Sequence, residues 1–326
     1  MKTLKLDGKW QLKQLNTAPA EHGGGPGKPL RIDKVNVPGD VLTELVRTKQ
    51  VADPFFGENE LQVQWVGECD WRYERPFMVP ATMLDEDRVL LQCDGLDTFA
   101  EVEINGKMVA TTDNMHREYE WDVKSLLKAG ENTIRVTFRS VNEYTRKRQA
   151  ERMIRSNPGG CHPTARPAWI RKQACNFGWD WGPVLVTMGI WRSIRMVGYS
   201  TAKIDHVAID QKHTSGKVAL DVACELSRVS RKSLAARATL RFGKKIVAET
   251  STETSGKMVD LALKVDDPKL WWPNGMGDQP LYDLQVELLD ADGHVIDTLT
   301  KRIGLRTLRL DRHKDKWGES FQFVVN

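Results

Sequence analysis

The chain has 326 residues, which suggests about two domains by length, and its 48 lysines and arginines against 44 aspartates and glutamates give a formal net charge of +4. So balanced a charge argues against a nucleic-acid-binding or membrane-surface protein, and no stretch of the sequence is long and apolar enough to cross a bilayer as a helix. The five cysteines include no CxxC pair and the seven histidines show no metal-ligand spacing, so neither a disulfide framework nor a zinc site is indicated.

The first half of the sequence carries few helical signals. The chain starts without the apolar core of about 7–15 residues that a secretory signal needs. A signal removed from the sequence would leave no trace, so the compartment stays open. Asp40 can cap a short helix over residues 41–46. Residues 142–155 predict a second helix with a weak apolar stripe, whose basic run, residues 146–148, is expected to be a solvated face.

Apolar and polar residues alternate with a period of two along much of the chain, the pattern of half-buried β-strands. Residues 100–104 predict a strand that runs into Asn105-Gly106, the strongest short signal for a hairpin turn. Residues 89–91 and 134–138 predict two more strands of this first half. Further strands are predicted at residues 218–222, 234–242, 259–265 and 284–288.

Short strands with turn signals at a spacing of roughly 8–15 residues indicate β-sandwiches. We therefore predict an all-β protein, with a first sandwich over residues 1–198 and a smaller immunoglobulin-like sandwich over 199–308. The irregular segment 142–178 is an excursion from the first sandwich, and its aromatic content argues against disorder. Residues 309–326 end in the alternating apolar run 321–325, so we expect the chain to be cut from a longer protein.

Four tryptophans fall within residues 169–191, and two of them flank Asp180. Gly178, Gly182 and Pro183 hold this triplet in a loop, where scaffolds usually place recognition chemistry. Indole faces cover the C–H faces of a sugar ring, and a carboxylate accepts hydrogen bonds from its hydroxyls. The loop therefore predicts a sugar subsite. The alternative is a pair of core indoles with Asp180 capping a turn.

No other pattern predicts a catalytic site. The sequence contains no G-x-S-x-G nucleophile elbow. Its acidic clusters lie in turn-like or polar contexts, where we expect exposed side chains rather than the paired carboxylates of glycoside hydrolysis. These clusters are residues 85–87, residues 266–267, and Glu58 with Glu60.

The run from Arg171 to Arg192 resembles the signature of the β-mannosidases of glycoside hydrolase family 2. Other blocks of the chain agree with this family in the same order, from about residue 6 to residue 326. They lie at residues 37–41, 53–60, 70–73, 96–98, 104–106, 113–115, 270–275 and 304–306.

The resemblance implies a jelly-roll, galactose-binding-like sandwich, then an immunoglobulin-like sandwich, then a (β/α)8 barrel. A barrel needs about 250 residues, so residues 309–326 would be only its truncated start. The family's acid/base and nucleophile glutamates lie on the barrel, and no catalytic residue is assigned to this chain.

The resemblance also implies roles for loop residues. Asp180 would hold hydroxyls of a terminal mannose, O4 and O6, in the −1 subsite. Trp179 would form a wall of that subsite, and Arg171 would position the loop or join the site. No cofactor or metal is implied. The implied partners are a β-mannoside oligosaccharide or glycan and the catalytic barrel of the same parent chain, with no nucleic acid and no membrane.

The sequence thus predicts the N-terminal, non-barrel portion of a retaining exo-β-mannosidase, inactive by itself. A stand-alone lectin-like module is the alternative from another class. A family 2 glycosidase for another sugar, such as a β-galactosidase, β-glucuronidase or exo-glucosaminidase, also stays open.

Overall fold

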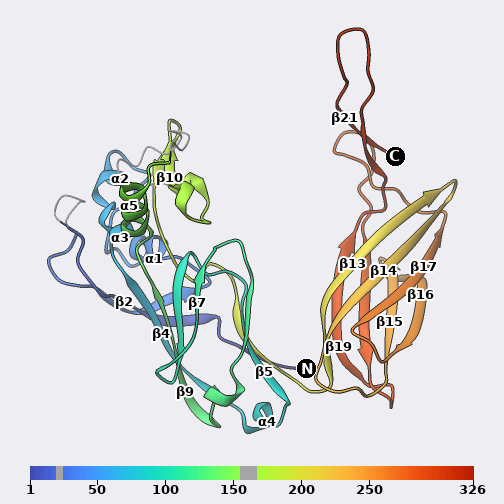
Figure 1. Cartoon of the computed structure of the whole chain (residues 1–326), viewed down its shortest axis with the longest axis horizontal. Coiled ribbons are helices and arrows are strands. Elements are labelled where there is room, and N and C mark those ends of the chain that lie inside the picture. The colour runs from blue at the N-terminus through green and yellow to red at the C-terminus, as the bar shows by residue number, and fades with distance from the viewer. Residues whose placement is uncertain (20–24, 155–166) are drawn as a thin grey trace. The chain divides into compact units, whose positions relative to one another are not determined.

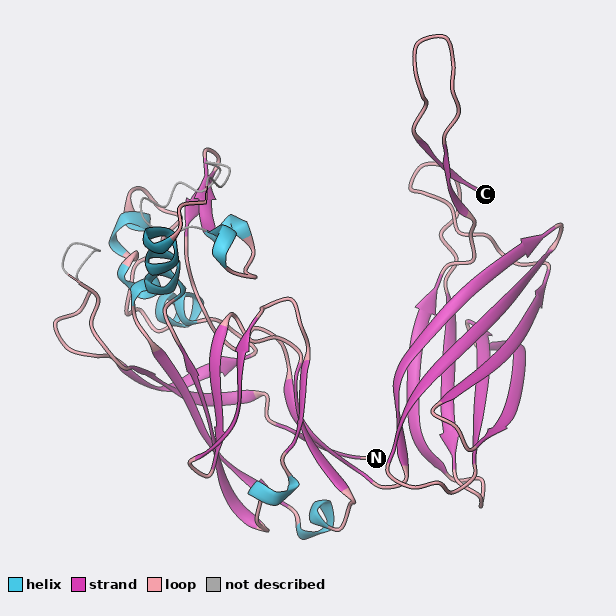
Figure 2. Ribbon diagram, in the orientation of Figure 1, coloured by secondary structure: helices cyan, strands magenta, loops and turns pink. Residues whose placement is uncertain are grey.

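A computed structural model describes residues 1–19, 25–154 and 167–326 (Figure 1). The chain divides into two compact units, Lys2–Gly198 and Tyr199–Asn326, with Met1 assigned to the latter. Strands are the main secondary structure of both units (Figure 2), which confirms the all-β fold class. Among the described residues, no helix is long and apolar enough to cross a membrane.

Two sheets form the sandwich of the first unit. Their strands are β1 (Lys2–Lys5), β2 (Gly8–Gln14), β3 (Arg31–Val37), β4 (Trp71–Val79), β5 (Arg88–Cys93), β6 (Phe99–Ile104), β7 (Lys107–Asp113), β8 (Tyr119–Asp122), β9 (Gly130–Phe138) and β12 (Ile194–Tyr199). One sheet has the order β3-β2-β4-β9-β6-β7 and the other β1-β12-β5-β8. Trp10 and Tyr73 of the first sheet and Leu91 and Ile194 of the second are buried in one core.

The hairpin β6–β7 shows how the local sequence sets the fold. Val102 and Ile104 are fully buried, as their alternation predicts. Asn105 and Gly106 have φ values of 53° and 77°, the left-handed conformation that the two central residues of a tight hairpin turn require. The predicted hairpin is therefore confirmed.

The helices belong to the first unit (Figure 2). They are α1 (Val41–Arg47), α2 (Asn59–Gln62), α3 (Trp65–Glu68), α4 (Ala81–Leu84) and α5 (Val141–Glu151). Asp40 caps α1, since its carboxylate accepts a hydrogen bond from the Thr43 backbone N–H at 3.0 Å. Helices α1, α2, α3 and α5 gather at one end of this unit, together with strand β10 (Phe177–Trp179) (Figure 1).

Two expectations about α5 are corrected. The predicted helix 142–155 is too long, because Arg152 is already extended, with φ −149° and ψ 110°. Residues 155–166 of the predicted excursion lie outside the described part. The basic run is not uniformly solvated, because the Arg146 guanidinium donates at 2.8 Å to the buried carboxylate of Glu68 on α3.

The second unit is a smaller sandwich. Its strands are β13 (Ala202–Thr214), β14 (Lys217–Arg228), β15 (Leu234–Phe242), β16 (Lys245–Thr254), β17 (Met258–Asp266), β18 (Tyr282–Leu289) and β19 (Val295–Ile303). The sheets β13-β14-β17 and β16-β15-β18-β19 share one core, to which Leu220 of β14 and Val286 of β18 contribute as the alternation predicts. A separate hairpin, β20 (Leu308–Asp311) with β21 (Gln322–Val325), follows.

Candidate functional site

The tryptophan-flanked carboxylate lies at the tip of a short hairpin. Strands β10 (Phe177–Trp179) and β11 (Gly182–Val184) pair antiparallel, and Asp180 and Trp181 form the turn between them. Trp179 is 42% exposed and Trp181 is 79% exposed. Their ring centroids are 6.4 Å apart and the ring planes are tilted by 42°. Neither indole belongs to the core, so the interpretation as two core indoles is wrong.

The base of the hairpin is packed, unlike its tip. The side chain of Phe177 is fully buried in a small cluster with Val184, Val186 and Val141 of α5. Gly178 follows with a φ of +79°, a conformation in which a residue with a Cβ would be strained. The chain thus passes within two residues from the buried Phe177 to the exposed Trp179.

The Asp180 side chain is exposed. Within the described residues it forms no hydrogen bond and no ion pair. Both carboxylate oxygens can therefore accept hydrogen bonds from a ligand. An exposed carboxylate between two exposed indoles offers hydrogen-bond acceptors and apolar faces side by side.

Arg171 is placed differently from Trp179 and Asp180. Its carbonyl oxygen accepts a hydrogen bond from the Met115 backbone N–H at 3.0 Å, and its side chain is exposed. In the described part of the chain, its guanidinium forms no hydrogen bond or ion pair with Asp180. The structure thus brings Trp179 and Asp180 together on one turn and fixes only the backbone of Arg171.

A buried ion pair next to Arg171 was not found from the sequence. The Lys172 ammonium, with a side chain 0% exposed, pairs with the Asp97 carboxylate and donates at 2.9 Å to the carbonyl oxygen of Thr187. Burial lowers the pKa of Lys172, and the negative charge of Asp97 opposes that shift. The Thr187 hydroxyl donates in turn to Asp40 at 2.7 Å. These contacts fix the segment that follows the hairpin.

A second set of contacts holds the hairpin from the α2 region, residues 59–64, which comprises α2 and the two residues after it. The Glu60 carboxylate accepts a hydrogen bond from the Val184 backbone N–H at 2.6 Å. The Gln64 side-chain amide donates at 2.8 Å to both the Val184 and the Glu60 carbonyl oxygens. Glu58 is exposed as expected, but Glu60 is only half-exposed. The sequence offered no local signal for a partner 124 residues away.

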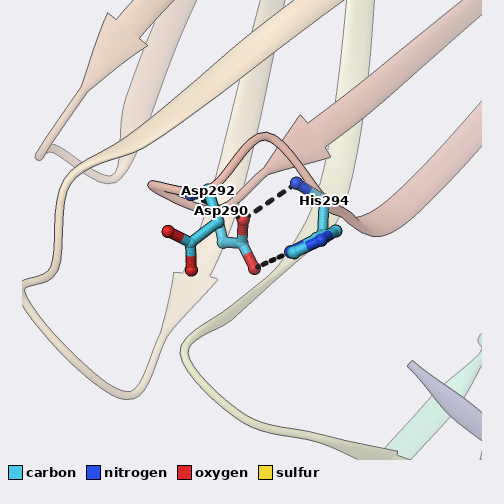
Figure 3. A group of neighbouring side chains, drawn as sticks. All are labelled: Asp290, Asp292 and His294. Carbon is cyan, nitrogen blue, oxygen red and sulfur yellow. Dashed lines mark hydrogen bonds and ion pairs between the residues drawn. The ribbon is translucent and has the colours of Figure 1, made fainter.

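Among the described residues, one group of side chains has possible metal-ligand atoms close enough to one another to hold an ion: Asp290, Asp292 and His294 (Figure 3). They lie in the turn between β18 and β19. One oxygen of Asp290 accepts the backbone N–H groups of Asp292 and His294 at 3.0 and 2.9 Å, and the other lies 3.5 Å from the His294 ring nitrogen. This carboxylate is engaged in holding the turn, so the group does not indicate a metal site.

The Asp290 turn predicts a pH effect on stability. The hydrogen bond from the His294 backbone N–H is the main reason why the pKa of Asp290 lies below its ordinary value of 3.8. A carboxyl group with a lowered pKa stabilises the fold above its unfolded-state pKa, and this contribution disappears as the pH falls through the folded-state pKa. We expect Asp290→Ala to lower the melting temperature at about pH 6 and to lower it by less at about pH 2. An equal difference at both pH values, measured by calorimetry, would contradict this reasoning.

The comparisons with known families cover both units. The family model described as "Glycosyl hydrolase 2 galactose-binding domain-like" matches residues 10–192. The model described as "Glycosyl hydrolases family 2" matches residues 202–306.

Several curated proteins that are similar in sequence to this chain are named β-mannosidases. Beta-mannosidase B of Emericella nidulans is 33% identical over 294 residues, which are 89% of this chain and 34% of that protein. Beta-mannosidase B of Aspergillus niger is 33% identical over 297 residues. This chain thus spans about a third of the length of the curated relatives that it matches.

Among solved structures, the β-D-mannosidase of Dictyoglomus thermophilum aligns with the whole chain and 39% of its own length, with a TM-score of 0.88 and 33% identity. The exo-chitosanase CsxA of Amycolatopsis orientalis aligns with a TM-score of 0.68 and 19% identity, which shows a common fold alone.

Proposed function

Since the chain belongs to the glycosyl hydrolases of family 2, we propose that it is the N-terminal, non-barrel portion of a retaining exo-β-mannosidase that releases terminal β-D-mannose. Residues 1–198 are then its sugar-binding sandwich and residues 199–308 its immunoglobulin-like sandwich. The relatives named as β-mannosidases, together with the β-D-mannosidase structure from Dictyoglomus thermophilum, support this sugar over others.

The exposed carboxylate of Asp180 is the observation that carries the proposal. In the proposed −1 subsite, a terminal mannose lays a C–H face on Trp179, and two of its hydroxyls, O4 and O6, donate to Asp180. Because the hairpin tip closes one side of such a pocket, it favours the end of a chain over an internal sugar. Arg171 contributes by holding the loop from its backbone side.

The bond-breaking groups come from a barrel in this proposal, and residues 309–326 lead into it. A retaining mechanism needs two carboxyl groups about 5–5.5 Å apart. One attacks the anomeric carbon while the other protonates the leaving oxygen, and water then releases the mannose with the second group acting as base. Asp180 only binds sugar in this scheme.

The chain of 326 residues should therefore release no mannose by itself. We expect no product above the buffer control when the purified chain is incubated with p-nitrophenyl β-D-mannoside and β-mannobiose. The polypeptide that joins this chain to its catalytic domain should hydrolyse both, and prefer the mannoside to the corresponding galactoside and glucuronide. Catalytic turnover by the 326 residues alone would refute the assignment.

Titration distinguishes the proposal from a lectin-like module. The exposed aromatic tip is the feature that such a module would share. Half of a sugar site should bind mannose and β-mannobiose with millimolar affinity or not at all, because the rest of the pocket is supplied by the barrel. Firm binding by the 326 residues, measured by calorimetry, would favour the lectin-like module.

A further inference from the structure

The hairpin that carries Asp180 is too small to define its own position. Each strand has three residues, and only Trp179 with Gly182 and Phe177 with Val184 pair across it. An isolated two-stranded hairpin is marginally stable in water. The direction in which the tip points therefore depends on contacts from outside the hairpin.

Strand β11 is held at one residue, Val184, by hydrogen bonds from outside the hairpin. Val184 ends β11, and both of its backbone polar groups are bound by side chains from the α2 region: its N–H by Glu60 at 2.6 Å and its C=O by Gln64 at 2.8 Å. The bond to Glu60 is charge-assisted, and such bonds are about twice as strong as neutral ones. Val184 is therefore held through both of its backbone polar groups.

The support behind these side chains is rigid. Gln64 also donates to the backbone carbonyl oxygen of Glu60 at 2.8 Å, so its side chain holds the Glu60 backbone as well as Val184. The next residues, Trp65 and Val66 of α3, are 4% and 1% exposed and lie in the main core of the sandwich. The α2 region thus connects the hairpin to the core.

We propose that Glu60 is a positioning residue for Asp180: by accepting the Val184 N–H, it fixes the hairpin tip at the angle at which Asp180 meets the sugar. This inference rests on the proposed function, in which Asp180 binds substrate hydroxyls. Glu60 itself touches no substrate. A misplacement of a binding group by about 1 Å can cost two orders of magnitude in rate.

The first test is a double-mutant cycle in the polypeptide that contains the catalytic domain. We expect Glu60→Ala to lower kcat/KM about 10-fold and Glu60→Gln, whose amide oxygen can still accept the Val184 N–H, to restore most of it. In an Asp180→Ala background, Glu60→Ala should change kcat/KM by less than about twofold, because its effect passes through Asp180. Glu58→Ala is the matched control, since Glu58 is exposed and makes no capping hydrogen bond. An equal loss in both backgrounds overturns the proposal.

The second test needs no activity and uses the 326-residue chain. Hydrogen exchange of the Val184 amide, followed by NMR, should accelerate in Glu60→Ala and stay slow in Glu60→Gln and Glu58→Ala. An unchanged rate in Glu60→Ala overturns the proposal. If this exchange behaves as expected but Asp180→Ala leaves hydrolysis intact, the proposed function fails while the structural clamp on Val184 stands. The two failures are therefore distinguishable.

Discussion

Asp180→Ala in the polypeptide with its catalytic domain is expected to lower kcat/KM on β-mannosides by on the order of 30- to 1,000-fold. The substitution removes an exposed acceptor that has no hydrogen-bond or ion-pair partner within the described residues. In the proposed complex it loses two hydrogen bonds from sugar hydroxyls to a charged group. Each such bond is worth about 1.5–3 kcal/mol. Because water can replace part of the lost acceptor at this exposed position, we expect a combined loss of about 2–4 kcal/mol, which corresponds to that fold-change.

Control variants separate sugar binding from general damage. Asp180→Asn keeps one acceptor oxygen without the charge, so its loss should be intermediate. Asp33→Ala removes an exposed carboxylate from β3 of the same unit. Within the described residues this carboxylate makes only a surface ion pair with Arg31, so the substitution should leave kcat/KM unchanged. The melting temperature of Asp180→Ala should equal that of the unsubstituted protein, because the side chain has no described partner to lose. A change in kcat/KM below about threefold would leave Asp180 as an ordinary turn residue.

Local features of the fold could be predicted from the sequence because their causes are local. The alternation that buries Val102 and Ile104 and the turn residues Asn105-Gly106 need only neighbouring residues to act. The same holds for Asp40, whose carboxylate caps the helix that begins at the next residue. The loop around Trp179-Asp180-Trp181 was predicted in the same way, from the glycines and the proline beside it.

The support of the site could not be predicted, because its causes are distant in sequence. Glu60 was grouped with exposed acids, since nothing in its neighbours shows that Val184 would lie 2.6 Å away. Asp97 and Lys172 are 75 residues apart and become partners only after the sandwich has formed. Local patterns record which face of a strand is apolar, whereas side chains that join separate segments depend on tertiary packing. The residues proposed to bind sugar were therefore easier to find than the residues that hold them in place.

The buried pair of Lys172 and Asp97 predicts the largest effect on stability. Lys172→Met is expected to lower the free energy of unfolding of the first unit by about 3–5 kcal/mol. The substitution leaves the Asp97 carboxylate, only 6% exposed, without its cation. It also removes the donor to the Thr187 carbonyl oxygen. An uncompensated buried charge costs more than the pair contributes, because desolvation is no longer offset.

Denaturant titrations can isolate this effect. The chain has two units, so two transitions are expected and the one that belongs to the first unit is compared. Lys147→Met is the matched control: Lys147 forms an exposed pair with Glu143 in the same unit, and its loss should cost less than about 1 kcal/mol. Adding Asp97→Asn to Lys172→Met should recover part of the stability, because the double variant no longer buries an unpaired charge. If the double variant is as unstable as Lys172→Met alone, lost packing and not the orphaned carboxylate is the cause. In that case the pair contributes to the site only by filling space beneath the loop, and the hairpin is held by Glu60 and Gln64.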